Sequence, residues 1–276
     1  MELLSVGDQV GTGAYRLLSR FRGALAFTPK KERACGRKAR LAFVVEEAKG
    51  QGPLNIVVRG LDLTTVESLE VRDGQVTLGK EQKTIRRRYE SKLTLNGASQ
   101  ETLRENLKTL NITLTPALSP DAGEGESFET ALRNALRAGV EQLRRGDLEE
   151  GAKALKGLGR GLTPSGDDFL AGYLLGLNGL QSAFGMDFGR QIATIRRASR
   201  SDNRFSEAFL DCAAKGRYSE HTKGLVKALF EDAGADIPML AGRVLAFGAT
   251  SGADLAGGLY CALAQHRPAA VCMETI

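Results

Sequence analysis

Residues 157–168 read Gly-Leu-Gly-Arg-Gly-Leu-Thr-Pro-Ser-Gly-Asp-Asp, and a shorter copy, Gly-Ala-Thr-Ser-Gly-Ala-Asp, occupies residues 248–254. Each copy places a serine three residues before an aspartate and runs directly into a segment of small and apolar residues. This spacing is that of a capping box, in which the serine accepts a backbone hydrogen bond at a helix start and the acid reaches back. The two copies therefore predict two helices with the same starting chemistry, Ser251 lying 86 positions after Ser165.

A structural explanation has to be weighed first, because a serine cap contributes roughly 1 kcal/mol to a helix and needs no ligand. Three features favour a binding or catalytic site instead. The loop before the first copy is rich in glycine, Asp167 is a carboxylate that the cap does not need, and the motif occurs twice. The hypothesis is that the two helix starts face each other and form one polar site.

Amide groups at a helix start carry a partial positive charge and favour anions such as phosphate or carboxylate. The motif is not a P-loop, because the Gly-x-x-x-x-Gly-Lys order is absent, and it is not the Gly-x-Ser-x-Gly elbow of serine hydrolases. Ser165 is therefore not proposed as a covalent nucleophile. A polar cluster farther along would complete the pocket, although an ordinary helix N-terminus explains that cluster as well. The predicted substrate-binding residues are Gly159, Gly161, Thr163, Ser165, Gly166, Thr250, Ser251, Gly252, Asn203 and Ser206.

Three aspartates, Asp167, Asp168 and Asp254, are the predicted catalytic residues, and they complicate anion binding because carboxylates repel anions. Two alternatives stay open. The aspartates cap the helices and leave the dipoles free for an anion, or they present negative charge to an amide, an amine or a hydrated Mg²⁺. By spacing, Asp168 and Asp254 are the better caps, which leaves Asp167 as the expected free carboxylate. No cofactor motif is visible, so the cofactor is unknown.

Around the motifs, the pattern predicts an α+β fold with two domains. Residues 1–116 form the first, β-rich domain, a small barrel or sandwich, with strands over 41–45, 55–58, 84–95 and 112–114. An Asp-Gly turn within 71–76 predicts a hairpin. Residues 103–110 are expected to form a helix within this domain.

Residues 117–276 form the second, α-helical domain, which carries both motifs. Its first part, 119–126, is rich in proline, glycine and acids and is interpreted as a linker or surface loop. Glycines in the two inner helices would allow them to approach closely. Helices are expected over 128–143, 148–155, 169–180, 191–200, 205–212, 225–230, 238–247 and 255–264.

The composition, 42% hydrophobic and 26% charged in 276 residues, is typical of a folded globular protein. Four cysteines without a Cys-x-x-Cys pair and two histidines do not predict a zinc site, so no metal ligands are assigned. Basic residues cluster at 30–31, 37–40 and 86–88, and a single aromatic residue, Tyr89, follows the arginine run at 86–88. A nucleic-acid-binding surface typically combines basic clusters with stacking aromatic residues, so solvated loops are favoured over nucleic-acid binding. No apolar window suits a membrane span and no secretory signal is visible, which predicts a cytoplasmic protein.

The motif residues resemble a known family. GLGRGLTPSGDDFLAG at 157–172, SDNRFSEAFLDCAAKG at 201–216 and GATSGADLAGGL at 248–259 are similar to a bacterial family formerly described as a domain of unknown function. That family includes the AllH-type subunit associated with oxamate carbamoyltransferase. Arg160 stands where the family commonly has proline, so a role for this arginine is not carried over.

The resemblance implies a subunit that contributes to the transfer of a carbamoyl group between oxamate and phosphate. It also implies FdrA-like partner subunits, within anaerobic purine (allantoin) breakdown. Two readings follow. In the first, the chain is an enzyme subunit that binds a small carboxylate or acyl-phosphate, with Asp167 orienting an amide or a metal ion. In the second, it is a non-catalytic anion-binding or assembly subunit whose partner performs the chemistry. Both readings are compatible with an oligomer.

Overall fold

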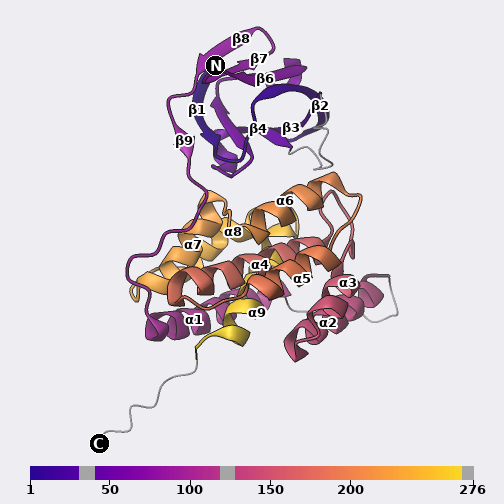
Figure 1. Cartoon of the computed structure of the whole chain (residues 1–276), viewed down its shortest axis with the longest axis vertical. Coiled ribbons are helices and arrows are strands. Elements are labelled where there is room, and N and C mark those ends of the chain that lie inside the picture. Colours follow the sequence, from indigo (N-terminus) through magenta and orange to yellow (C-terminus); the bar gives the residue numbers. More distant parts are fainter. Residues whose placement is uncertain (31–40, 119–127, 269–276) are drawn as a thin grey trace, which may run out of the picture. The chain divides into compact units, whose positions relative to one another are not determined.

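The computed structural model describes residues 1–30, 41–118 and 128–268 of the chain. Cys35, Cys272, Lys31, the basic cluster at 37–40 and the expected linker at 119–126 lie outside the described residues. The chain divides into two compact units, Met1–Lys92 with Tyr218–Glu220, and Leu93–Arg217 with His221–Ile276. Strands make up the first unit and helices the second (Figure 1), so the predicted α+β class is confirmed.

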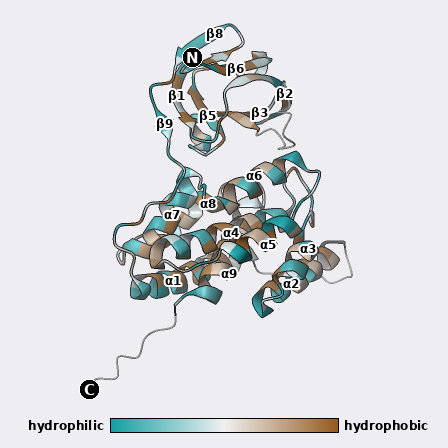
Figure 2. Ribbon diagram, viewed as in Figure 1, coloured by the Kyte–Doolittle hydropathy of each residue, from teal (hydrophilic) through white to brown (hydrophobic). Residues whose placement is uncertain are grey.

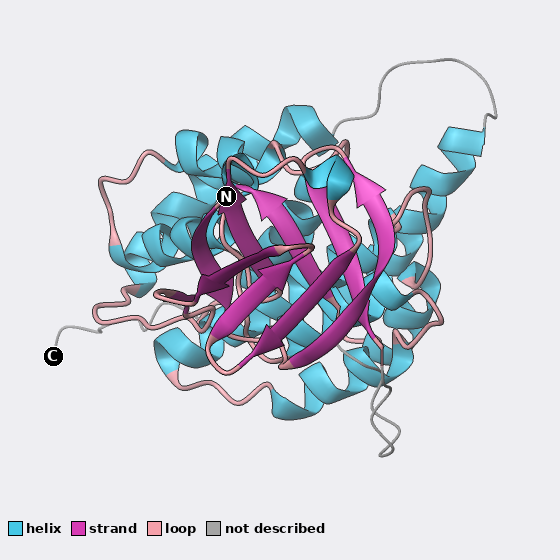
Figure 3. Cartoon of the chain, turned by 90° about the horizontal axis from the view of Figure 1, so that it is seen from above, coloured by secondary structure: helices cyan, strands magenta, loops and turns pink. Residues whose placement is uncertain are grey.

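The described strands of the first unit form one sheet, which curls into a half-barrel (Figure 3). Of the two expected architectures, this is closer to a barrel than to a sandwich. Its strand order is β8-β7-β6-β2-β3-β4-β5-β1-β9. The strands are β1 (Glu2–Gly7), β2 (Gly13–Phe21), β3 (Ala24–Pro29), β4 (Ala42–Glu46), β5 (Asn55–Arg59), β6 (Ser68–Arg72), β7 (Gln75–Leu78), β8 (Glu81–Thr84) and β9 (Arg88–Tyr89), with short 3-10 helices η1 (Glu47–Lys49) and η2 (Leu63–Thr65).

The predicted hairpin is present between β6 and β7, where Val71 pairs with Val76. Asp73 and Gly74 both have positive φ, at 50° and 74°, which is the backbone that a two-residue hairpin turn requires. Buried apolar residues from most strands, Phe27, Val44 and Ile56 among them, form the core of this unit.

The second unit is helical. Its helices are α1 (Gln100–Leu118), α2 (Phe128–Arg145), α3 (Leu148–Leu155), α4 (Ser165–Phe184), α5 (Gly189–Ala198), α6 (Arg204–Ala214), α7 (Glu220–Glu231), α8 (Ile237–Leu245) and α9 (Ser251–His266). Each segment beyond residue 127 that was expected to be helical overlaps one of these helices.

Two expectations for residues 84–118 are wrong. The predicted strand at 112–114 lies inside α1, because Leu103, Leu107, Leu110 and Leu114 are buried at helical spacing. The strand expected over 84–95 is reduced to the end of β8 and the two residues of β9. The two compact units divide between Lys92 and Leu93. The domain boundary expected after residue 116 lies farther along the chain and stays a prediction.

The helix α4 packs most extensively against α9, and Figure 1 shows the pair among the other helices of the unit. Residues of α4 are buried on nearly all sides, which agrees with its largely apolar colouring in Figure 2. A Cβ at Gly172 would meet Leu255, and one at Gly176 would meet Leu259 and Ala262. Increasing numbers in one helix therefore face increasing numbers in the other, so α4 and α9 are parallel with their N-termini at the same end.

No helix among the described residues combines the length and the apolar character that crossing a membrane would require.

Candidate functional site

The two copies of the motif meet. The loop that carries Thr163 leads into α4, and Ser251 is the first residue of α9. The Thr163 Oγ1 and Ser251 Oγ atoms lie 3.4 Å apart. The expectation that the two helix starts face each other therefore agrees with the geometry, and both starts lie within the helical unit.

The predicted capping boxes are wrong. The N-cap residues are Pro164 and Thr250, and neither side chain makes a capping hydrogen bond, because each serine is already the first helical residue. One residue farther into the helix, a serine hydroxyl no longer faces its own N3 amide. The Ser165 hydroxyl instead bonds Asp254, and the Ser251 hydroxyl bonds Asp168.

Each aspartate thus accepts a hydrogen bond from the opposite helix and a second one from a threonine close to its own. Thr163 Oγ1 donates to Asp168 Oδ2 at 2.9 Å, and the Thr250 hydroxyl bonds Asp254. Parallel helices bring two positive dipole ends together, which is unfavourable without negative charge nearby. The two carboxylates lie where they compensate this repulsion, so the helix starts form one polar centre.

Burial changes the acidity of this centre. Asp168 is only 8% exposed, and this burial raises the pKa of its carboxyl group to about 7. The hydrogen bonds from Ser251 and Thr163 lower the pKa, whereas the nearby charges of Asp254 and Asp167 raise it further. Burial also raises the pKa of Asp254, opposed by the hydrogen bonds from Ser165 and Thr250. A carboxyl group with a pKa near 7 exchanges a proton readily at neutral pH.

Asp167 differs from its expected role as a free carboxylate. Its Oδ1 accepts a hydrogen bond from the Gly157 amide at 2.8 Å, and the residue is 2% exposed. Its Oδ2 is buried without a hydrogen-bond partner, and so is Oδ2 of Asp254, among the residues that the structure describes. Buried acceptors without partners are rare, so each one calls for an explanation such as a water or a ligand.

The glycine-rich loop is shaped by its backbone. Gly159 and Gly161 have φ of 123° and 102°, which favours glycine, and a Cβ at Gly159 would lie 2.6 Å from the Ser165 nitrogen. The Gly166 amide donates to the Leu158 carbonyl at 2.8 Å, and the Gly252 amide donates to a carbonyl in the same way. These two amides are therefore directed at the protein rather than toward an anion.

Asn203 connects α6 to the motif. Its Oδ1 accepts from the amides of Phe205 and Ser206, so it is the cap that the simpler interpretation expected. Its Nδ2 also donates to the Leu162 carbonyl at 2.8 Å, which fixes the end of the glycine-rich loop. Ser206 is 1% exposed and its Oγ has no partner in the described chain. Both residues therefore lie in α6 and its cap, and only Asn203 has an observed bond to the motif loop.

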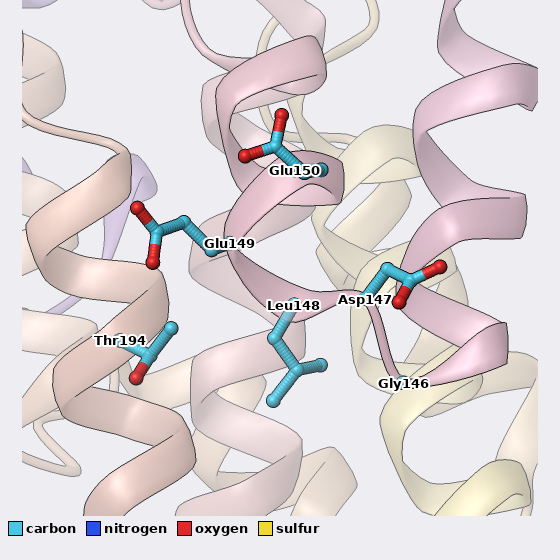
Figure 4. A pocket seen from close by; sticks show the side chains of 6 residues that line it. All are labelled: Gly146, Asp147, Leu148, Glu149, Glu150 and Thr194. Carbon is cyan, nitrogen blue, oxygen red and sulfur yellow. The ribbon is translucent and has the colours of Figure 1, made fainter.

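The structure shows two further features of this part of the molecule. Within the described residues, no group of three or more His, Cys, Asp or Glu side chains is arranged to hold a metal ion. An open hollow lies away from the motifs, between the start of α3 and α5 (Figure 4), lined by Gly146, Asp147, Leu148, Glu149, Glu150 and Thr194. Glu149 and Glu150 form ion pairs with Lys153, and Glu149 also pairs with Arg197, so both acids already have basic partners.

Sequence reasoning predicted that glycines in the two inner helices would allow close approach, but it missed the exchange of partners between the helices. A Cβ at Gly172 would lie 1.9 Å from the Leu255 oxygen, and one at Gly258 would lie 1.9 Å from the Phe169 oxygen. Gly258 lies 86 positions after Gly172, as Ser251 does after Ser165. An alignment of the chain with itself at a shift of 86 positions would have paired these serines and glycines, and it could have predicted the reciprocal contact.

Comparison with known proteins finds a family whose model matches part of the chain. A family model described as "Oxamate carbamoyltransferase subunit AllH" matches residues 155–263. This range is less than half of the chain, but it includes both copies of the motif and Asn203. Neither a curated protein nor a solved structure matches the chain. Over these residues the chain is similar to the AllH-type family, which confirms the resemblance drawn from its motifs.

Proposed function

We propose that this chain is a cytoplasmic subunit of an oxamate carbamoyltransferase-type enzyme, and that the facing starts of α4 and α9 bind a small carboxylate or acyl-phosphate that bears an amide. One observation carries the proposal: Asp168 and Asp254 each accept a serine hydroxyl from the opposite helix, so two segments far apart in the sequence build one polar centre. The name of the matching family supports a subunit of such an enzyme.

The centre has groups for both parts of such a ligand. The two positive helix ends suit an anionic oxygen, and the hydroxyls of Thr163, Ser165 and Ser251 hold the aspartates between them. The carboxylates suit amide N–H groups, and the buried Oδ2 atoms of Asp167 and Asp254 have no partner within the described chain. Asp168, with its pKa near neutrality, is the group suited to give or take a proton during carbamoyl transfer. An FdrA-like partner subunit would complete the enzyme, and a hydrated Mg²⁺ would accompany an acyl-phosphate.

A second function is favoured by a specific observation. The amides of Gly166 and Gly252 already donate to protein carbonyls, and the exchanged serine bonds hold the helix pair together. These features suit a subunit in which the motif closes a helix pair while a partner performs the chemistry. The two functions differ in whether Asp168 takes part in turnover.

Thermal unfolding of the purified chain with oxamate, carbamoyl phosphate or phosphate, each with and without Mg²⁺, tests the proposal. A ligand at a hundred times its dissociation constant stabilises the fold by about 2.7 kcal/mol. The isosteric variant Asp168→Asn should lose this effect, whereas Asp73→Asn, in the exposed turn between β6 and β7, should keep it. If none of the three compounds stabilises the chain or its complex with a partner subunit, the site is not a ligand site.

In a reconstituted complex, Asp168→Asn should also lower carbamoyl transfer while the complex still assembles. Unchanged turnover in an assembled complex would favour the second function over the first.

A further inference from the structure

Exposed apolar side chains gather near the starts of α4 and α9. Six large hydrophobic residues of the described chain are exposed, and three of them, Leu162, Met239 and Phe247, lie in the segments that lead into these two helices. Leu162 immediately precedes Thr163, whose Oγ1 lies 3.4 Å from the Ser251 Oγ. Single exposed apolar residues are ordinary on a protein surface, whereas a group of them marks a site of interaction.

The approach to α9 is exposed along its length. Met239 and Arg243 lie four residues apart in α8 and therefore share one side of this helix, and both are exposed. Phe247 follows four residues later and is 52% exposed, within a run of exposed residues at 246–250. Its carbonyl accepts a hydrogen bond from the Gly252 amide at 2.9 Å, which holds the loop against the start of α9. Phenylalanine, methionine and arginine are residue types enriched at contacts between proteins.

The same part of the molecule is basic. Five basic residues and one acidic residue lie in the three segments that carry or adjoin the helix starts, 156–165, 199–206 and 237–251. The middle segment adjoins them because Asn203 bonds the Leu162 carbonyl. Arg200 and Arg243 are exposed, and neither forms an ion pair within the described chain. The positive ends of the two helices add to this charge. A protein that docks here is therefore favoured if it carries carboxylates.

We propose that a partner subunit docks on this surface with an apolar side chain flanked by carboxylates. The docking surface consists of Leu162, Met239, Arg243 and Phe247. The inference rests on the proposed function, which includes a partner subunit, and it specifies the face that the partner covers and the chemistry of the contact. Because the loops that precede Ser165 and Ser251 belong to this surface, a partner bound there also excludes water from the helix starts.

Calorimetric titration of the chain with the FdrA-like partner subunit tests this inference. Phe247→Ser should weaken the complex by at least about tenfold, as the removal of an aromatic anchor does at protein interfaces. Arg243→Glu should weaken it as well and make its affinity less sensitive to salt, because a like charge then faces the partner's carboxylates. The matched controls are Ile112→Ser on α1 and Arg137→Glu on α2, since both residues are exposed and neither belongs to the docking surface.

Thermal unfolding of each variant shows whether it is folded, and light scattering shows whether the chain alone self-associates. If the complex forms and the folded Phe247→Ser and Arg243→Glu variants bind as the controls do, the partner docks elsewhere, and the proposed function survives. A tighter complex with Arg243→Glu would indicate a basic partner. A dimer of the chain alone that Phe247→Ser dissociates would indicate that a second copy covers the surface. Either result overturns the inference. If the unmodified chain binds no FdrA-like subunit, the proposed function itself fails, and the inference fails with it.

Discussion

Replacing Gly172 by alanine tests the close crossing of α4 and α9 on which the candidate site depends. The added Cβ would lie 1.9 Å from the Leu255 oxygen and 2.9 Å from the Leu259 nitrogen. Carbon and oxygen atoms approach to about 3.3 Å at the closest, so these two atoms have to move apart by roughly 1.4 Å. Such overpacking costs about 1–3 kcal/mol and occasionally more, while alanine gains about 0.5–1 kcal/mol of helix propensity over glycine. Subtracting this gain from the cost of overpacking, we expect a net loss of stability of up to about 2.5 kcal/mol.

Gly224, inside α7, provides the matched control, because a Cβ there meets no atom within 4 Å. Gly224→Ala should stabilise the protein by about 0.5–1 kcal/mol. Urea unfolding of both variants measures the two free energies, and Gly258→Ala should behave like Gly172→Ala because its contact is the reciprocal one. If Gly172→Ala proves as stable as Gly224→Ala, the helices are not packed backbone to backbone and the reasoning is refuted.

Two further predictions concern the candidate site. Folding raises the pKa of Asp168 from 3.8 to about 7, so between these pH values the folded state binds more protons than the unfolded state. The stability that this carboxyl group contributes is therefore complete below about pH 4 and is lost as the pH rises to about 7. Melting temperatures should therefore show Asp168→Asn gaining on the unmodified protein from pH 5 to about 7 and no further above it. A difference that stays constant from pH 5 to 7 would contradict the raised pKa. Asn203→Ala removes the cap of α6 and the bond to Leu162, and should cost about 1–2 kcal/mol in urea unfolding. Asn203→Asp restores the cap without the Leu162 bond and should recover part of the loss, and full recovery would show that this bond contributes nothing.

The helical part of the fold could be predicted because its apolar residues recur at helical spacing. Phe128 to Leu143 and the small, apolar residues after each motif indicated helices that the structure contains. The Asp73-Gly74 turn was predictable for a related reason, since few residue pairs adopt its backbone. Residues 112–114 were not, because a short apolar run fits a strand as well as a buried helix face. The helical spacing of Leu103, Leu107, Leu110 and Leu114 was the signal that would have extended the expected helix over this run, and all four are buried in α1.

The residue types of the candidate site were predictable, but their partners were not. A Ser-x-x-Asp spacing indicates a cap within one helix, and the pattern contains nothing about a second helix lying parallel at the same end. Because α4 and α9 cross at Gly172 and Gly258, each serine finds its acceptor in the other helix. The same limit applies to Asp167, whose partner is the Gly157 amide in the loop before its helix.

The central claim is that two helix starts form one ligand site, and calorimetric titration of oxamate and carbamoyl phosphate tests it most directly. The unmodified chain is compared with Ser165→Ala and Ser251→Ala, one substitution in each helix start. Each substitution removes the hydroxyl that holds an aspartate of the opposite helix in place. A hydrogen bond to a charged group contributes about 1.5–3 kcal/mol, so each substitution should weaken ligand binding by about tenfold or more. Loss of affinity in both variants is the result that the shared site predicts. Binding that is weakened by only one substitution, or by neither, would contradict it.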